Sequence, residues 1–113
     1  MNHSKQQEQD WKSKLRFGKL TTPYEHYTVI AEGVVGELAE GYSCRAGSAF
    51  MSMKTWASSP EEATDMVLAI GSHIGFRISG EIHVFESNPS KPPGDRPLGY
   101  DIQFKPFDAG RGT

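Results

Sequence analysis

The stretch that decides the fold is residues 58–86, SSPEEATDMVLAIGSHIGFRISGEIHVFE. It begins with the residues of a helix N-terminus: Ser59 as the N-cap, Pro60 in the first helical position and Glu62 three residues after the cap. We expect a capping box, in which the Ser59 side chain accepts a backbone N–H and the Glu62 side chain returns to the cap. Gly75 is expected to end the helix, because glycine adopts the left-handed C-terminal conformation without a Cβ clash.

The spacing of apolar residues changes within this stretch. Before Gly75 they recur every three or four residues, as on one buried face of a helix: Ala63, Met66, Val67, Ile70 and Ile74. After Gly75 the spacing becomes two, with Phe76, Ile78, Ile82 and Val84 on one side and Arg77, Ser79, Glu81 and His83 on the other. This pattern predicts a helix followed by a strand whose sheet is covered on one face and solvated on the other.

Three further strands are predicted. Residues 26–35 are rich in β-formers, and residues 34–38 either continue that strand through a bulge or turn back as a short hairpin. Residues 49–57 carry large side chains on both faces, as in a central strand or one whose outer face meets a partner. In residues 99–105, apolar and polar residues alternate, with Tyr100, Ile102 and Phe104 set against Asp101, Gln103 and Lys105.

The other segments are a second helix and a connector. Residues 4–17 are expected to form a short polar helix with Ser4 as its cap and Gly18 at its end. The proline-rich residues 87–98 predict an extended connector between the last two strands. The order is therefore α-β-β-α-β-β. We expect an α+β fold, a two-layer sandwich in which an antiparallel sheet of about four strands carries the helix 60–74 on one face.

Length and composition bound the class of protein. We expect a single domain over residues 1–113, with an N-terminal helical segment at 1–20 and a frayed tail at 109–113. The single cysteine, Cys44, fits a reducing cytosol, and the N-terminus lacks the apolar run of a signal peptide. No stretch has the roughly 18 apolar residues of a membrane span. A cytoplasmic protein without a membrane partner is expected.

Charge is unevenly distributed along the chain. Residues 1–20 hold five Lys or Arg against two acidic residues, and residues 21–113 hold seven against twelve, a net charge of −5. An acidic body disfavours direct nucleic-acid binding and favours a basic partner. Ordinary solubility charge is the simpler interpretation of the same numbers.

Residues that would carry chemistry are few. No nucleotide-binding, zinc-protease or nucleophile-elbow motif is present, and Cys44 beside Arg45 lacks a histidine placed to activate it. Glu81 and His83 share one strand face and Asp101 is expected on the neighbouring strand, so the three could form an acid/base set or a metal site. Cross-strand pairing of solvated charges is the favoured alternative.

The same polar sheet face is a candidate binding surface. Aromatic residues among acidic ones make good protein interfaces, and an acidic, aromatic-bearing face could cover the basic active site of a nuclease. The residues expected to contact a partner are Glu81, His83, Glu86, Asp95, Tyr100 and Asp101.

Residues 49–108 resemble small bacterial immunity proteins of polymorphic and contact-dependent toxin systems. The resemblance lies in the run AFMSMKTWASSPEEA, the turn IGSHIGF at residues 70–76 and the closing GYDIQFKPFD. It implies a cytosolic, noncatalytic protein that binds one cognate toxin domain, often a nuclease, and blocks its active site or its access to substrate. These families share no common contact motif, so the resemblance assigns no residue.

The expected function is therefore a noncatalytic, immunity-type inhibitor without a cofactor or a bound metal. Two alternatives remain open. One is a phage- or plasmid-borne inhibitor of a nucleic-acid-binding host defence system, which would also be bound through electrostatic attraction to an acidic surface. The other is a small enzyme or metal-binding protein that uses Glu81, His83 and Asp101.

Overall fold

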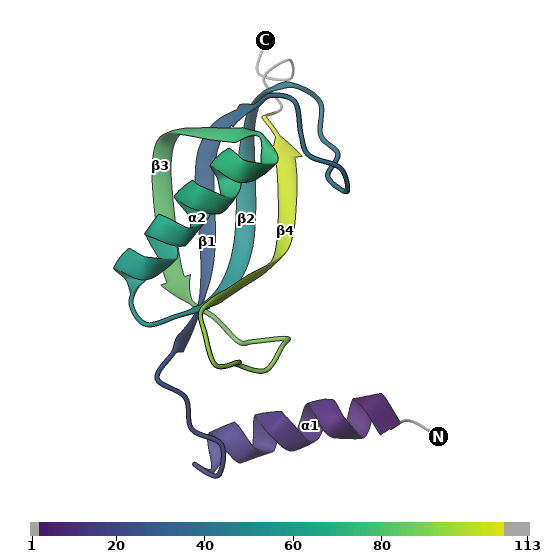
Figure 1. The fold of residues 1–113 in the computed structure, drawn as a ribbon, viewed down its shortest axis with the longest axis vertical. Coiled ribbons are helices and arrows are strands. Elements are labelled where there is room, and N and C mark those ends of the chain that lie inside the picture. Colours follow the sequence, from purple (N-terminus) through teal and green to yellow (C-terminus); the bar gives the residue numbers. More distant parts are fainter. Residues whose placement is uncertain (1–2, 108–113) are drawn as a thin grey trace.

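The computed structural model describes residues 3–107, with side chains from residue 10 onward; the tail expected at 109–113 lies outside them. The chain forms two helices and one four-stranded antiparallel sheet, which confirms the α+β prediction. The elements are α1 (His3–Arg16), β1 (Glu25–Val35), β2 (Gly47–Ala57), α2 (Pro60–Ile74), β3 (Phe76–Glu86) and β4 (Leu98–Pro106). In Figure 1, α2 lies across one face of the sheet and α1 lies beyond its lower end.

Both ends of α2 are capped as the sequence predicts, with one difference. Ser59 has an extended backbone and its Oγ accepts the Glu62 N–H at 3.1 Å. The Glu62 carboxylate, however, accepts from the N–H and hydroxyl of Ser58, at 2.7 and 2.9 Å, and not from the Ser59 backbone as expected. At the other end Gly75 is left-handed, with φ 105°, and its N–H donates to the Gly71 carbonyl.

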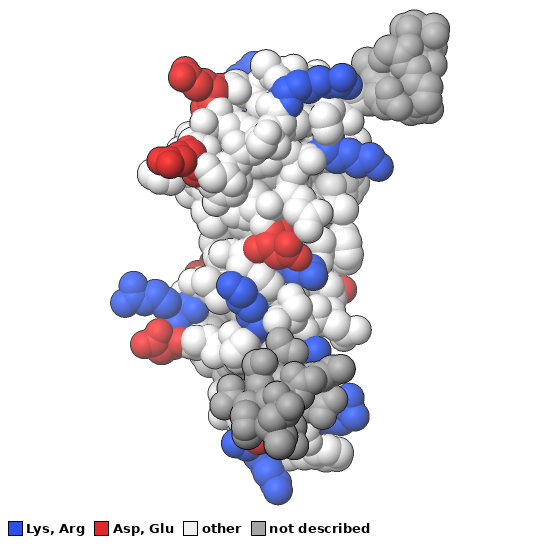
Figure 2. Space-filling model, turned by 90° about the vertical axis from the view of Figure 1, so that its right-hand side faces the viewer, with Lys and Arg blue, Asp and Glu red and all other residues white. Residues whose placement is uncertain are grey.

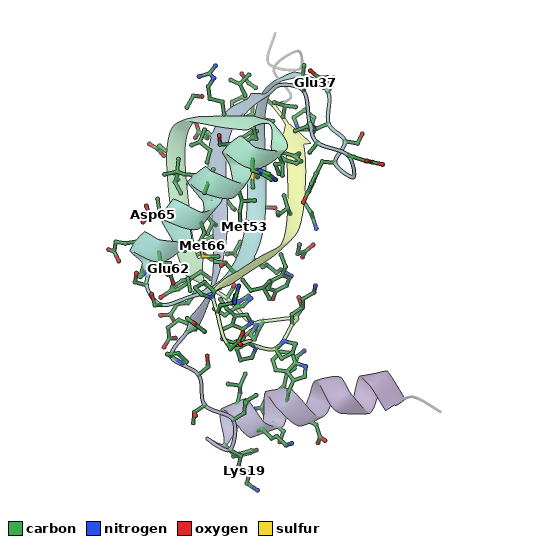
Figure 3. The ribbon with its side chains drawn as sticks, in the orientation of Figure 1. Lys19, Glu37, Met53, Glu62, Asp65 and Met66 are labelled. Atoms are coloured by element: carbon green, nitrogen blue, oxygen red, sulfur yellow. The ribbon has the colours of Figure 1, made fainter. Side chains whose placement is uncertain are left out.

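The core lies between α2 and the sheet. Met53 and Met66 meet in this layer (Figure 3), and side chains that are fully or almost fully buried surround them. These are Val29, Ala31, Val35, Met51, Ala63, Val67 and Phe76. Because the β1–β2 register pairs Val29 with Met53 and Ala31 with Met51, odd-numbered residues of both strands face the helix. Their even-numbered neighbours form the opposite face, which we call the outer face.

The strand order is β3-β1-β2-β4, so β3 and β4 form the two edges of the sheet. The expectation that β4 pairs with β3 is therefore wrong. The connection at residues 87–97 has to cross three strand spacings, about 14 Å. The connection contains four prolines and several bends, and it runs beneath the ends of the two central strands (Figure 1). Strand periodicity carries no information on which strands are neighbours.

A bulge in β4 changes the predicted face of Tyr100. Ser52 pairs with Gln103 and Lys54 pairs with Tyr100, so two β4 residues oppose the single residue Met53. The extra residue is Asp101, which has a left-handed backbone with φ 54°. Tyr100 therefore lies on the outer face with Lys54, whereas strict alternation put it with Ile102 and Phe104 on the helix side.

The N-terminal part and the β1–β2 connection are irregular additions to this core. Strand β1 ends at Val35, and residues 36–46 neither extend it nor form a hairpin. They are held to the end of α2, where the Gly36 and Ala39 N–H groups donate to the carbonyls of Gly75 and Ile74, both at 2.9 Å. Helix α1 ends before Gly18, as predicted, and Gly18 has φ 75°. No helix among the described residues is long and apolar enough to cross a membrane.

Candidate functional site

The three residues proposed for acid/base or metal chemistry do not come together. Glu81 and His83 lie on β3 and Asp101 lies on β4, at opposite edges of the outer face and about 14 Å apart by strand spacing. Within the part of the chain that the structure describes, no three His, Cys, Asp or Glu residues are grouped as metal ligands would be. The hypothesis of a shared site for these three side chains is therefore wrong.

Each of these residues has a local partner instead. Glu81 pairs with His83 at 3.1 Å, and both side chains are more than half exposed. Asp101 accepts from Gln103 Nε2 at 3.1 Å and pairs with Lys54 Nζ at 3.1 Å. These two contacts, the Gln103 hydrogen bond first, hold the pKa of Asp101 below its usual value. Only the Asp101–Lys54 contact joins two strands, so the expected cross-strand pairing of solvated charges is found for Asp101 and not for Glu81 and His83, which pair within β3.

The remaining predicted contacts occupy separate places. Glu86 is exposed at the end of β3, and Asp95 is exposed in the connection at 87–97. The Asp95 carbonyl accepts a long hydrogen bond from the Tyr24 hydroxyl, at 3.4 Å. Tyr100 is only 6% exposed. Its side chain is therefore part of the interior and does not offer a contact surface.

A buried polar network surrounds Tyr100, and no sequence pattern indicated it. The Ser90 N–H donates to the Tyr100 hydroxyl at 3.0 Å, and that hydroxyl lies 2.7 Å from His26 Nε2. His26 Nδ1 lies 3.0 Å from the Ser87 carbonyl, which can only accept, so Nδ1 carries the proton and Nε2 accepts from Tyr100. The partners of His26 are more than 60 residues away in the chain, so no local pattern pairs His26 with them.

Trp56 closes the same end of the outer face. Its indole N–H donates to the Lys91 carbonyl at 2.8 Å, and its ring meets the edge of His26 with centroids 5.0 Å apart. The connection at 87–97 thus covers the lower end of the outer face, where Trp56 and His26 are almost completely buried. Cys44 lies elsewhere, half-buried against the main core.

The network makes a prediction about pH. Burial lowers the pKa of His26 most, Lys54 lowers it slightly, and the Ser87 hydrogen bond opposes both. In the unfolded chain, His26 binds a proton from about pH 6.5 downward. The folded chain binds this proton only at a lower pH, so the free energy of unfolding should fall as pH drops below about 6.5. Urea unfolding of His26→Gln should lose this part of the pH dependence. The matched change in the exposed helix residue, His73→Gln, should keep it. Equal pH profiles for wild type and His26→Gln would contradict the assignment.

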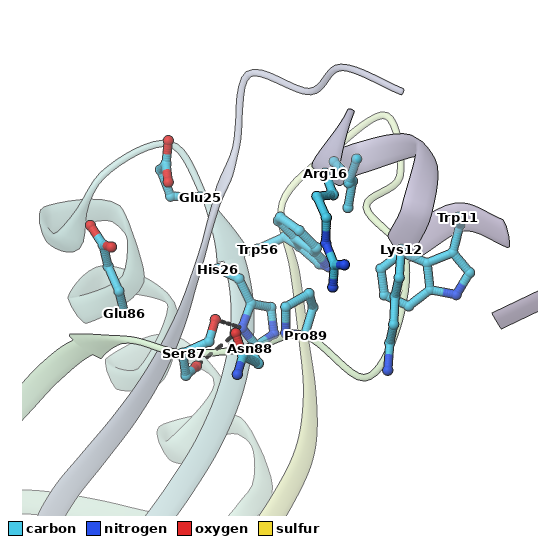
Figure 4. Close-up of a pocket in the computed structure, with 11 residues that line it drawn as sticks. Trp11, Lys12, Arg16, Glu25, His26, Trp56, Glu86, Ser87, Asn88 and Pro89 are labelled. Carbon is cyan, nitrogen blue, oxygen red and sulfur yellow. Dashed lines mark hydrogen bonds between the residues drawn. The ribbon is translucent and has the colours of Figure 1, made fainter. Parts of the chain in front are cut away.

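A cleft of about 560 Å³ lies between α1 and this covered end (Figure 4). Lys12 and Arg16, one helical turn apart on α1, lie on one side of it, and His26 and Pro89 lie on the other. The full lining is Trp11, Lys12, Leu15, Arg16, Glu25, His26, Trp56, Glu86, Ser87, Asn88 and Pro89. Charges of both signs line the cleft, so it presents no single-sign site for a charged ligand.

Acidic side chains gather at the start of β1, beside this cleft, and Glu25 and Glu86 line both places. Tyr27 is buried at the start of β1, and its pKa is raised first by burial and then by the negative charges of Glu25, Glu86 and Glu61. These three exposed carboxylates come from β1, β3 and the first turn of α2. We call them the acidic corner. Glu62 and Asp65 extend it along α2 (Figure 3).

The charge pattern differs on the β4 side of the molecule. Figure 2 shows that side, and lysine, arginine and acidic side chains are interspersed over it. The predicted acidic surface is thus not spread evenly over the sheet. Burial aside, Glu25, Glu61 and Glu86 are the described carboxylates that together raise the pKa of the buried Tyr27. They lie at the acidic corner because β1, β3 and α2 each have an end there.

No protein-family model, curated protein or solved structure matches the chain.

Proposed function

We propose that this chain is a noncatalytic, immunity-type inhibitor that binds a basic toxin domain through the acidic corner. The observation that carries the proposal is that β1, β3 and α2 each have an end beside Tyr27: Glu86 pairs with Tyr27, Glu25 precedes it by two residues on β1, and Glu61 lies in the first turn of α2. A cationic protein surface placed there would relieve the mutual repulsion of the three carboxylates, so binding gains electrostatic energy and a faster association. The proposal places the chain in the cytoplasm, where a nuclease toxin would act.

Two further observations support a protein partner. Along α2 the exposed residues Glu61, Asp65 and Leu68 recur at helical spacing, and Leu68 is 43% exposed. An apolar side chain bordered by charges matches the composition of protein interfaces. The separation of Glu81 and His83 from Asp101 also leaves the proposed acid/base set unassembled, which favours a binding function over that chemistry.

A pair of matched charge reversals tests the proposal. Glu25→Lys with Glu86→Lys reverses two charges of the corner, and Glu81→Lys with Asp101→Lys reverses two on the outer face. Glu61 is left intact because its charge also stabilises the first turn of α2. We expect the corner variant to bind the cognate toxin at least about tenfold more weakly, whereas the outer-face variant, with the same change in net charge, stays within about threefold.

The assay is co-expression with the product of the adjacent upstream gene, followed by affinity pull-down, calorimetry and growth. Relief of toxicity by the wild type, lost only in the corner variant, would support the proposal. A loss confined to the outer-face variant would move the binding site to Glu81 and Asp101. A wild-type protein that neither binds nor protects would overturn the immunity function.

A further inference from the structure

Among residues 3–107, the upper part of the outer face has no helix or long connection over it. Helix α2 lies on the other side, and the connection at 87–97 covers only the end that contains His26 and Trp56. Among residues 3–107, no helix lies over the rest of this face. One of its aromatic side chains, Phe50, is 37% exposed. A hollow of about 400 Å³ lies beside Phe50 and Ile30. We call this surface the open outer face.

Charge is arranged in a row across the open outer face. Glu32 of β1 pairs with Phe50 of β2, which pairs with Lys105 of β4. On the other side, Ala31 of β1 pairs with Ile82 of β3, the chain neighbour of Glu81, and the register shifts directly after this pair. The row is therefore Glu81, Glu32, Phe50 and Lys105, with negative charge at the β3 edge and positive charge at the β4 edge.

We propose that two copies of this chain form a homodimer by packing their open outer faces together about a two-fold axis parallel to the strands. This rotation exchanges the two edges of the sheet, so β3 of one copy faces β4 of the other. It brings Glu81 of each copy opposite Lys105 of the other, and the opposite-charge contact occurs twice. The outer positions of the row are therefore complementary to each other under this rotation, and the inner positions place Glu32 of each copy opposite Phe50 of the other.

The geometry of sheet packing fits this arrangement. Aligned sheets pack about 10 Å apart, with apolar side chains between them and longer charged side chains meeting at the rim. Ile30 and Phe50 lie on the two central strands, and Glu81 and Lys105 lie at the rims.

The dimer leaves the acidic corner free. Glu86 pairs with Tyr27 and Glu25 pairs with Ala57, two buried residues on the helix-bearing side of the sheet. The inference is thus independent of the proposed toxin site. A failure of one proposal does not decide the other.

Charge-swapped full-length variants provide a specific test. Glu81→Lys alone or Lys105→Glu alone places like charges opposite each other twice, so each variant should dimerise at least about tenfold more weakly than the wild type. When the two variants are mixed, both contacts become opposite-charge pairs, and a dimer with one copy of each should form. Sedimentation equilibrium measures the masses, and a tag on one variant identifies the mixed dimer. Like-charged single variants that dimerise as well as the wild type would exclude this two-fold arrangement.

A second pair of variants tests the apolar centre. Phe50→Glu should abolish the dimer while keeping the wild-type far-UV circular dichroism spectrum. Leu68→Glu, which changes a similarly exposed apolar residue on α2, should leave the dimer unchanged. A wild-type protein that stays monomeric up to several hundred micromolar would overturn the proposal. A dimer that Leu68→Glu disrupts and Phe50→Glu does not would also overturn it.

Discussion

Replacing Gly75 with alanine is expected to destabilise the protein by about 2–4 kcal/mol, because the left-handed backbone and the lack of space both oppose a side chain there. Gly75 has φ 105°, a conformation that non-glycine residues adopt at a cost. A Cβ atom at this position would overlap the Glu37 carbonyl oxygen and would lie 2.9 Å from its carbon and 3.1 Å from the Leu38 Cα. These neighbours are backbone atoms, which cannot move aside as a flexible side chain can.

Urea or thermal unfolding of the full-length protein measures this effect, and Gly94→Ala is its matched control. A Cβ atom at Gly94 would have no other atom within 4 Å, and Gly94 does not have a positive φ. Its replacement should change the free energy of unfolding by less than about 0.5 kcal/mol. If Gly75→Ala were as stable as Gly94→Ala, the segment at 36–39 would not pack against the end of α2 as described.

The Gly75 turn also shows what could be predicted from the sequence. Capping residues and apolar spacing act within a few residues, so the ends of α2 and the inward faces of β2 and β3 were predictable. The position of the segment that packs on Gly75 was not, because it depends on Leu38 and its neighbours meeting α2 from over 30 residues away. Strand order is a similar case. Nothing local in β4 indicates that it pairs with β2 and not with β3.

The candidate site illustrates the same limit. Alternation placed Glu81 and His83 on one face correctly, since the relation between them is local. Asp101 was placed beside them because β3 and β4 are consecutive in sequence, but β1 and β2 lie between them. The His26 and Tyr100 network required both the strand order and the bulge at Asp101, so no sequence pattern indicated it. Aspartate can adopt the left-handed backbone of Asp101, with φ 54°. An aspartate in a sequence does not by itself predict that conformation.

Replacing Trp56 with alanine is expected to lower the free energy of unfolding by about 3–5 kcal/mol, the range for removing a buried large aromatic side chain. The sequence left open whether Trp56 belongs to the core or meets a partner. In the structure it is 4% exposed, contacts the His26 ring and donates to the Lys91 carbonyl. Its loss would leave that carbonyl and the His26 ring without their cover. Trp56→Phe should recover more than half of the loss, because it restores most of the volume without the hydrogen bond.

Trp11 provides the control, because it is the other tryptophan and lies half-buried on α1. Trp11→Ala should change the free energy of unfolding by less than about 1 kcal/mol. Each variant that lacks one tryptophan reports the fluorescence of the other. The Trp56 fluorescence measured in Trp11→Ala should shift to longer wavelength on unfolding, and the Trp11 fluorescence measured in Trp56→Ala should not. A small effect of Trp56→Ala, with Trp56 fluorescence already that of a solvated indole, would mean that the 87–97 connection does not cover this end. The lower end of the sheet would then be open, and the outer face available to a partner would extend over its full length.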